Sequence, residues 1–100
     1  MILVNIDREK DQVKKVSIQG HAKYADYGKD IVCSACSSIV TTTVNAILSF
    51  DESAIWYDAE QGNLEIKVKK QDDITKKLIE NMIQLLKELE NNYPKNIKVE

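Results

Sequence analysis

The chain contains few of the residues that mark flexible, fibrous or disulfide-stapled proteins. Its 100 residues include one proline, three glycines, two cysteines and one histidine. So little proline and glycine excludes a collagen-like chain and argues against linkers and low-complexity tracts. Two cysteines are too few for the disulfide framework of a small secreted domain. We therefore expect a single domain over residues 1–100, held together by a modest hydrophobic core that oligomerisation would supplement.

Charge of one sign is also scarce, and so are long apolar runs. The formal net charge is −2, which lacks the basic footprint of proteins that bind phosphate backbones, so direct nucleic-acid binding is not expected. The start Met1–Asp7 is too short and too soon charged for a signal peptide, and no run of about 18 apolar residues indicates a membrane span. These features predict a cytoplasmic protein whose thiols are reduced.

Alternating and helical apolar patterns predict seven elements. Ile2–Ile6 and Val13–Ile18 read as an opening pair of strands, followed by a buried helix over 31–50, where Val40, Val44, Ile47 and Leu48 recur at helical spacing. Two further strands are expected at Ala54–Asp58 and Leu64–Lys69, joined by a turn at 61–63. An amphipathic helix follows from Asp72 or Asp73 to about Asn92, and a last strand covers 96–100. Its predicted apolar stripe is Ile74, Leu78, Met82, Leu85 and Leu89.

The order β-β-α-β-β-α-β indicates an α+β fold. We expect a mostly antiparallel sheet with two helices covering one of its faces. Other signals in this stretch are structural: Lys67 and Lys69 alternate with apolar residues on the solvent side of a strand, and Trp56 and Tyr57 are expected in the core or at a subunit contact.

The chemistry-bearing residues gather around the start of the first helix. The only histidine, His21, precedes Cys33 by twelve positions, and Asp30 lies three before that cysteine, where an N-cap carboxylate is typical. A helix N-terminus and a nearby imidazolium both favour a thiolate over a thiol. Backbone N–H groups of Cys33 and Ser34 would then face a developing oxyanion. This arrangement predicts a cysteine nucleophile activated by histidine.

The loop between the histidine and the helix is expected to admit a peptide. It runs over residues 22–29 and carries Tyr24, Tyr27 and Gly28. Asp30 is expected to be a cap rather than an acid that orients His21. Ser37, one turn after Cys33, would either hydrogen-bond near the thiol or bond back to its own helix.

Other interpretations of the same residues stay open. Cysteine is often a buried apolar residue, and a single histidine is more often structural than catalytic. Cys33-Ser34-Ala35-Cys36 also has the C-x-x-C spacing of thiol-disulfide exchange proteins, although it follows a hairpin rather than a parallel β-α unit. A metal site of His21, Cys33 and Cys36 would need water as its fourth ligand, so it ranks below redox chemistry.

A resemblance adds to this pattern. Gly20-His21-Ala22, Gly28, Asp30-Ile31-Val32-Cys33-Ser34-Ala35 and Ser37 resemble the motif of the ribosomal-processing cysteine proteases, the Prp family. The resemblance extends over the chain in its length and in the order of its elements. Cys36 departs from the family pattern, in which an apolar residue such as valine is usual.

The resemblance implies a small homodimeric cysteine endopeptidase that needs no cofactor or metal. Its substrate would be the N-terminal peptide of a large-subunit ribosomal protein, from which a short extension is removed. His21 falls on the catalytic histidine and Cys33 on the nucleophile; 22–29 falls on the substrate loop, and Asp30 and Ser37 match motif positions of less settled role. Two alternatives remain: a thiol-disulfide oxidoreductase using Cys33 and Cys36, and a non-catalytic ribosome-associated binding module.

Overall fold

The computed structural model of the chain describes residues 1–20, 27–60 and 62–100. Its elements follow the predicted order β-β-α-β-β-α-β, which is confirmed. They are β1 Ile2–Glu9, β2 Gln12–Gln19, α1 Tyr27–Phe50, β3 Ile55–Glu60, β4 Asn63–Val68, α2 Asp73–Asn92 and β5 Ile97–Val99. The strands are mostly longer than predicted, and α1 begins one turn before the expected Ile31.

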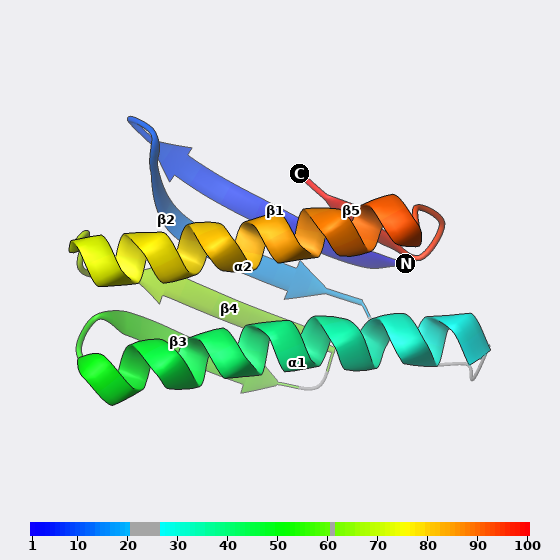
Figure 1. Cartoon of the computed structure of the whole chain (residues 1–100), viewed down its shortest axis with the longest axis horizontal. Coiled ribbons are helices and arrows are strands. Elements are labelled where there is room, and N and C mark those ends of the chain that lie inside the picture. Colours follow the sequence, from blue (N-terminus) through cyan, green and yellow to red (C-terminus); the bar gives the residue numbers. More distant parts are fainter. Residues whose placement is uncertain (21–26, 61) are drawn as a thin grey trace.

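The five strands form one mixed sheet in the order β3-β4-β2-β1-β5. Neighbouring strands are antiparallel except for β1 and β5, which pair in parallel with Ile2 opposite Ile97. Both helices lie on the same face of the sheet, side by side, and the residues that the structure describes place no helix on the opposite face (Figure 1). The predicted α+β architecture, a mostly antiparallel sheet with two helices, is therefore confirmed.

The core fills the space between this sheet and the helices. Inward-facing strand residues alternate with exposed ones, as a half-buried sheet requires, and α1 contributes an apolar side at helical spacing. The fully buried larger side chains are Ile47, Ile66, Ile79, Met82, Ile83, Leu86, Ile97, Val4, Val16, Val32 and Val40. These β-branched and aliphatic residues fix α1 to the strands beneath it, so the position of Cys33 is set by the core.

The buried side of α2 differs from the predicted stripe by about one residue. The buried residues of α2 are Thr75, Ile79, Met82, Ile83 and Leu86, whereas Ile74 and Leu85 are 47% and 38% exposed. Met82 was predicted correctly, and Leu78 and Leu89 pack at the margin of the core. Two neighbouring apolar stripes run along this helix, and periodicity alone does not decide which of them faces the sheet.

Side-chain hydrogen bonds fix the start of α2 and the connection that follows α1. Asp72 is the N-cap of α2: its Oδ1 accepts from the Thr75 N–H at 2.9 Å, which confirms the predicted cap. After α1, the Asp51 carboxylate accepts from the Ser53 N–H at 3.0 Å and from the Lys70 Nζ at 2.6 Å. Asp51 thereby joins the connection after α1 to the segment that precedes α2.

Ile31–Phe50 is long and apolar enough to cross a membrane, although the sequence was expected to hold no such apolar run. In this fold the apolar side of the segment packs on the sheet through residues such as Val32, Val40 and Val44. Its outer side carries short polar residues, among them Thr41 and Thr42, which are exposed. The composition therefore fits a core helix, because the same apolar residues that suggest a span are used for packing.

The helix-free face of the sheet is polar and charged. Lys67 Nζ lies 3.8 Å from the Glu65 carboxylate and 4.8 Å from the centre of the Trp56 ring, and Lys15 Nζ lies 3.5 Å from Glu65. The expected solvent side of β4 is observed at Lys67. Trp56 is 39% exposed on this face rather than in the core, whereas Tyr57, the next residue, packs against the core.

Candidate active site

Cys33 is the seventh residue of α1, one turn further into the helix than predicted. Its side chain is half-buried and packs against the core. Backbone N–H groups at this depth donate to carbonyls four residues earlier. The expectation that the N–H groups of Cys33 and Ser34 are available for an oxyanion is therefore wrong for this structure. The helix places the Cys33 side chain at the edge of the core.

The helix start also changes the roles expected of the residues before Cys33. Because α1 begins at Tyr27, Tyr27 and Gly28 belong to its first turn rather than to the loop, and Asp30 lies inside the helix rather than at its N-cap. Acidic residues are typical of the whole first turn as well as of the cap, so the sequence signal does not distinguish the two positions. In the helical register Asp30 stands one turn before Cys33.

Two of the predicted site residues lie outside the described residues. These are His21, the expected base, and Tyr24 of the expected substrate loop. The remaining supporting residues are on the helix. Ser34 and Ser37 are both exposed, and Ser37 stands one turn after Cys33 on the same side of α1.

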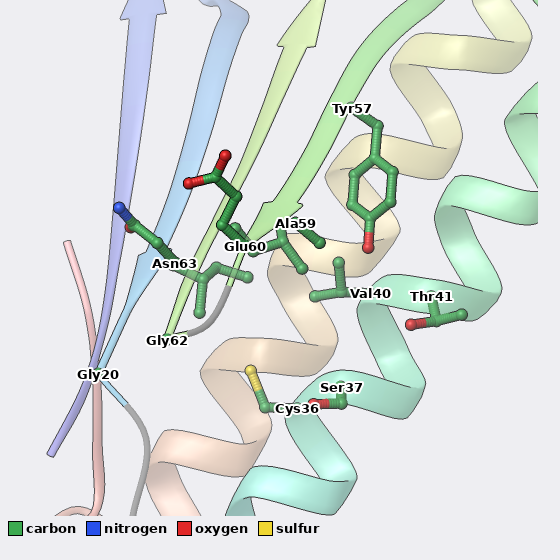
Figure 2. A pocket seen from close by; sticks show the side chains of 12 residues that line it. Gly20, Cys36, Ser37, Val40, Thr41, Tyr57, Ala59, Glu60, Gly62 and Asn63 are labelled. Atoms are coloured by element: carbon green, nitrogen blue, oxygen red, sulfur yellow. The ribbon is translucent and has the colours of Figure 1, made fainter.

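A cavity of about 320 Å³ opens immediately after Cys33 along α1. One wall is the side of α1 that carries Cys36, Ser37 and Val40, and the opposite wall is the β3–β4 hairpin with Tyr57 and Leu64 (Figure 2). Its lining is Ile18, Gly20, Cys36, Ser37, Val40, Thr41, Tyr57, Ala59, Glu60, Gly62, Asn63 and Leu64. Cys33 stands about one helical turn before Cys36 and Ser37 of the cavity wall.

Cys36 forms part of the cavity wall although only 4% of its surface is exposed. Its sulfur points into the cavity in Figure 2. Burial, and secondly the nearby Cys33, raise the pKa of the Cys36 thiol to about 11. Cys36 is therefore a protonated thiol near neutral pH, unsuited to act as the nucleophile.

Gly20 also lines the cavity, at the last position before His21. Its φ is +82°, and a Cβ built there would lie 2.5 Å from the carbonyl oxygen of Met1. Its N–H donates to the Gly62 carbonyl at 3.1 Å, which joins the end of β2 to the β3–β4 turn. Only glycine satisfies both conditions, because the left-handed conformation and the close backbone approach each disfavour a side chain.

The hairpin side of the cavity was not anticipated from the sequence. Tyr57 and Leu64 were predicted as strand residues, and their inward direction could have been predicted from the alternation of β3 and β4. Ala59 lies just beyond the predicted strand, which ended at Asp58. The position of these residues opposite α1 depends on β4 pairing with β2, a contact between segments far apart in the chain. No local pattern reports that pairing.

The described residues do not form a metal-binding site. Among residues 1–20, 27–60 and 62–100, no group of three or more His, Cys, Asp and Glu side chains is placed to hold a metal ion. A cysteine on a core helix, about one turn before a cavity, is compatible with an enzyme that uses a thiol on a bound substrate.

Comparison with known proteins identifies the family. The family model described as cysteine protease Prp matches residues 1–98, and the chain belongs to this family. The ribosomal processing cysteine protease Prp of Staphylococcus aureus (strain Mu50 / ATCC 700699) is 33% identical over 103 residues, covering 99% of this chain and 97% of the relative. The resemblance inferred from the motif is thus confirmed, and the protein is a cysteine protease.

Solved structures agree with this assignment. The crystal structure of the S. aureus protease Prp with a covalently linked product peptide superposes with a TM-score of 0.86 at 29% identity, covering 99% of this chain and 97% of that one. The same protease with a substrate peptide also gives a TM-score of 0.86, at 26% identity, covering 100% and 98%. The fold of this chain is therefore that of a peptide-cleaving enzyme.

Proposed function

We propose that this protease removes a short N-terminal extension from a large-subunit ribosomal protein during ribosome maturation. The observation that carries the proposal is Cys33 on α1, about one helical turn before the wall of a 320 Å³ cavity, in a fold of the Prp family. The S. aureus relatives support it, since they are described as ribosomal processing proteases and one of them holds a covalently linked product peptide. Its site of action is accordingly the cytoplasm.

The proposed catalytic pair is His21 and Cys33. His21 takes the thiol proton, the Cys33 thiolate attacks the scissile carbonyl, and the amine of the new N-terminus leaves with a proton from His21. Water then attacks the thioester and releases the extension as a carboxylic acid. The histidine precedes the cysteine in the chain, which is compatible with the mechanism because such pairs are defined by geometry rather than order.

The supporting residues are proposed from their register on α1. Asp30 and Ser37 stand one turn before and one turn after Cys33, and Ser34 directly follows it. The Ser37 hydroxyl, exposed at the cavity wall, is suited to hydrogen-bond to the substrate backbone or to the thiol. Tyr24, Tyr27 and Gly28 precede the nucleophile and are proposed to contact the incoming peptide.

The cavity supports a peptide substrate by its shape and lining. Val40 and Leu64 supply apolar surface, whereas the exposed Glu60 and Asn63 stand at its hairpin end. An apolar side chain next to the scissile bond has room in the cavity.

A homodimer is the proposed state in solution. The margin of α2 exposes Ile74 and Leu85, and Phe50 at the end of α1 is 69% exposed. Large apolar side chains at the surface of a 100-residue chain are suited to a subunit contact. Light scattering coupled to size-exclusion chromatography tests this: twice the chain mass supports the dimer, and the single-chain mass contradicts it.

Proteolysis is tested with a synthetic peptide that spans the extension and the start of the mature ribosomal protein. Mass spectrometry of the products should show a single cut with the unmodified protein and none with Cys33→Ser or His21→Ala. A peptide with the residues around the cut site in scrambled order serves as the matched substrate control. An intact peptide after incubation with the unmodified protein would contradict the proposal.

A further inference from the structure

Two thiols on α1 stand in the register that allows them to react with each other. Cys33 and Cys36 are separated by three residues on the helix, and both are present as thiols. Ideal helix geometry places their Cα atoms about 5 Å apart. Disulfides join Cα atoms that lie about 4.4–6.8 Å apart, so the pair is within bridging range. The proposed proteolytic mechanism uses only the first of the two thiols.

Cys33 is more accessible to solvent than Cys36, and burial raises the pKa of the Cys36 thiol. We therefore expect an oxidant to react with Cys33 before Cys36. Cys33 is half-buried, whereas Cys36 is 4% exposed and reaches solvent only through the cavity. Burial, together with Cys33, raises the pKa of Cys36 to about 11, so Cys36 remains protonated while Cys33 meets an oxidant. The contribution of Cys33 to this shift also indicates that the two groups are close enough to interact electrostatically.

We infer that Cys33 and Cys36 form a reversible redox modification site, at which a hydroperoxide converts the catalytic thiol into a Cys33–Cys36 disulfide. In the first step the Cys33 sulfur attacks hydrogen peroxide: the O–O bond breaks, an S–O bond forms, and water leaves. Sulfur is oxidised by two electrons and the peroxide is reduced. In the second step Cys36 loses its proton and attacks the Cys33 sulfur, the S–O bond breaks, and hydroxide leaves as water.

The environment of Cys36 favours the second step once the first has occurred. Oxidation of Cys33 to a sulfenic acid gives a sulfur that a neighbouring thiol can attack to form a disulfide. The cavity of about 320 Å³ that Cys36 lines leaves room for water to accept the proton and for a small thiol reductant to reach the bridge. The resolving thiol is thus three residues away from the oxidised one, so only the two side chains and the turn of α1 that carries them need to move.

A bridge at this spacing would be strained and easily reduced. Side chains three apart on a helix have Cβ atoms about 5–6 Å apart. A disulfide needs them about 3.5–4.5 Å apart. Closing the bond therefore tightens the second turn of α1, and strain makes a disulfide more readily reduced. The modification stops proteolysis without committing the nucleophile to irreversible sulfinic acid.

The experiment compares the unmodified protein with Cys36→Val under excess hydrogen peroxide, which oxidises an unprotected sulfenic acid further to the irreversible sulfinic acid. Lys29 and Lys67 are the nearest tryptic cleavage points, so residues 30–67 form one peptide that contains both cysteines. Intact mass and this peptide are measured before and after dithiothreitol, and cleavage of the ribosomal peptide is normalised to each variant's own untreated rate. Only the cleavage readout rests on the proposed function, because the masses report the bridge whether or not the protein cleaves the peptide.

The unmodified protein should lose the mass of two hydrogen atoms within peptide 30–67, lose cleavage, and regain both on reduction. Cys36→Val should instead gain oxygen atoms and stay inactive after reduction. The inference is overturned if the unmodified protein gains oxygen as the variant does, if the bridge links two chains, or if Cys36→Val recovers equally. Absence of cleavage in every untreated sample, with the bridge present, would refute the proposed function and leave the modification site intact.

Discussion

Gly20→Ala is expected to destabilise the protein by a backbone effect that can be worked out from the structure. An L-residue in the left-handed region costs about 1–2 kcal/mol, and Gly20 has φ +82°. The new Cβ would also lie 2.5 Å from the Met1 carbonyl oxygen, a backbone atom that cannot turn away. Forcing a methyl group into such a site costs about 1–3 kcal/mol more.

One effect opposes these costs. Alanine restricts the unfolded chain more than glycine does, which returns about 0.4–1 kcal/mol. The net loss in the free energy of unfolding is then about 1–5 kcal/mol. For a domain of this length each kcal/mol lowers Tm by roughly 4–8 °C, so Tm should fall by at least about 4 °C.

The measurement is urea and thermal unfolding followed by circular dichroism, with Gln19→Ala as the matched control. Gln19 is the exposed neighbour of Gly20 in β2, so its substitution should change stability by less than about 0.5 kcal/mol. Because Gly20 directly precedes His21, cleavage by Gly20→Ala should also be reduced at a temperature where the variant is folded. If Gly20→Ala unfolds at the same urea concentration as the control, the close approach to Met1 does not exist.

Three further changes have defined outcomes. Asp11 has φ +67° in the two-residue turn between β1 and β2. Because glycine adopts this conformation without strain, Asp11→Gly should raise the free energy of unfolding, measured in urea, by up to about 1 kcal/mol. A lower free energy of unfolding than that of the unmodified protein would contradict this turn. Asp72→Ala removes the cap bonded to the Thr75 N–H and should cost about 1 kcal/mol in the same assay; no change would mean that the cap does not form in solution. The Lys70 ammonium, with Ser53, lowers the pKa of Asp51 from 3.8 to about 2. The depressed pKa means that this carboxylate stabilises the fold above about pH 4 and ceases to do so as the pH falls toward 2, so Asp51→Asn should have a flatter stability profile over that window. An unchanged profile would contradict the pairing.

The element order could be predicted because each element carries its own local signal. Val13–Ile18 alternates, the turn at 61–63 contains glycine, and Asp72 precedes an amphipathic run. The boundaries were less certain. Asp7, Arg8 and Glu9 carry no apolar alternation, yet they continue β1 because a long hairpin can extend into solvent.

Candidate site residues could be named from the sequence, but the local structure around them could not. The spacing of Cys33 from His21 and the surrounding motif predict Cys33 as the nucleophile, because the residue types carry the chemistry, and that role stays a prediction. The start of α1 at Tyr27 was missed because Tyr27 and Gly28 add nothing to the apolar period, and this moved Asp30 from the cap into the helix. The cavity was missed because its second wall depends on how the sheet is paired.

A matched pair of serine variants on one helix tests the role of Cys33 most directly. Cys33→Ser and Cys36→Ser both replace a thiol by a hydroxyl, one turn apart on α1, and circular dichroism would verify that both fold. The rate of cleavage of the ribosomal peptide is then measured for each. A Cys33 nucleophile predicts that cleavage is abolished in Cys33→Ser and retained in Cys36→Ser. Cleavage that persists in Cys33→Ser, or that is lost only in Cys36→Ser, would contradict the assignment of the nucleophile.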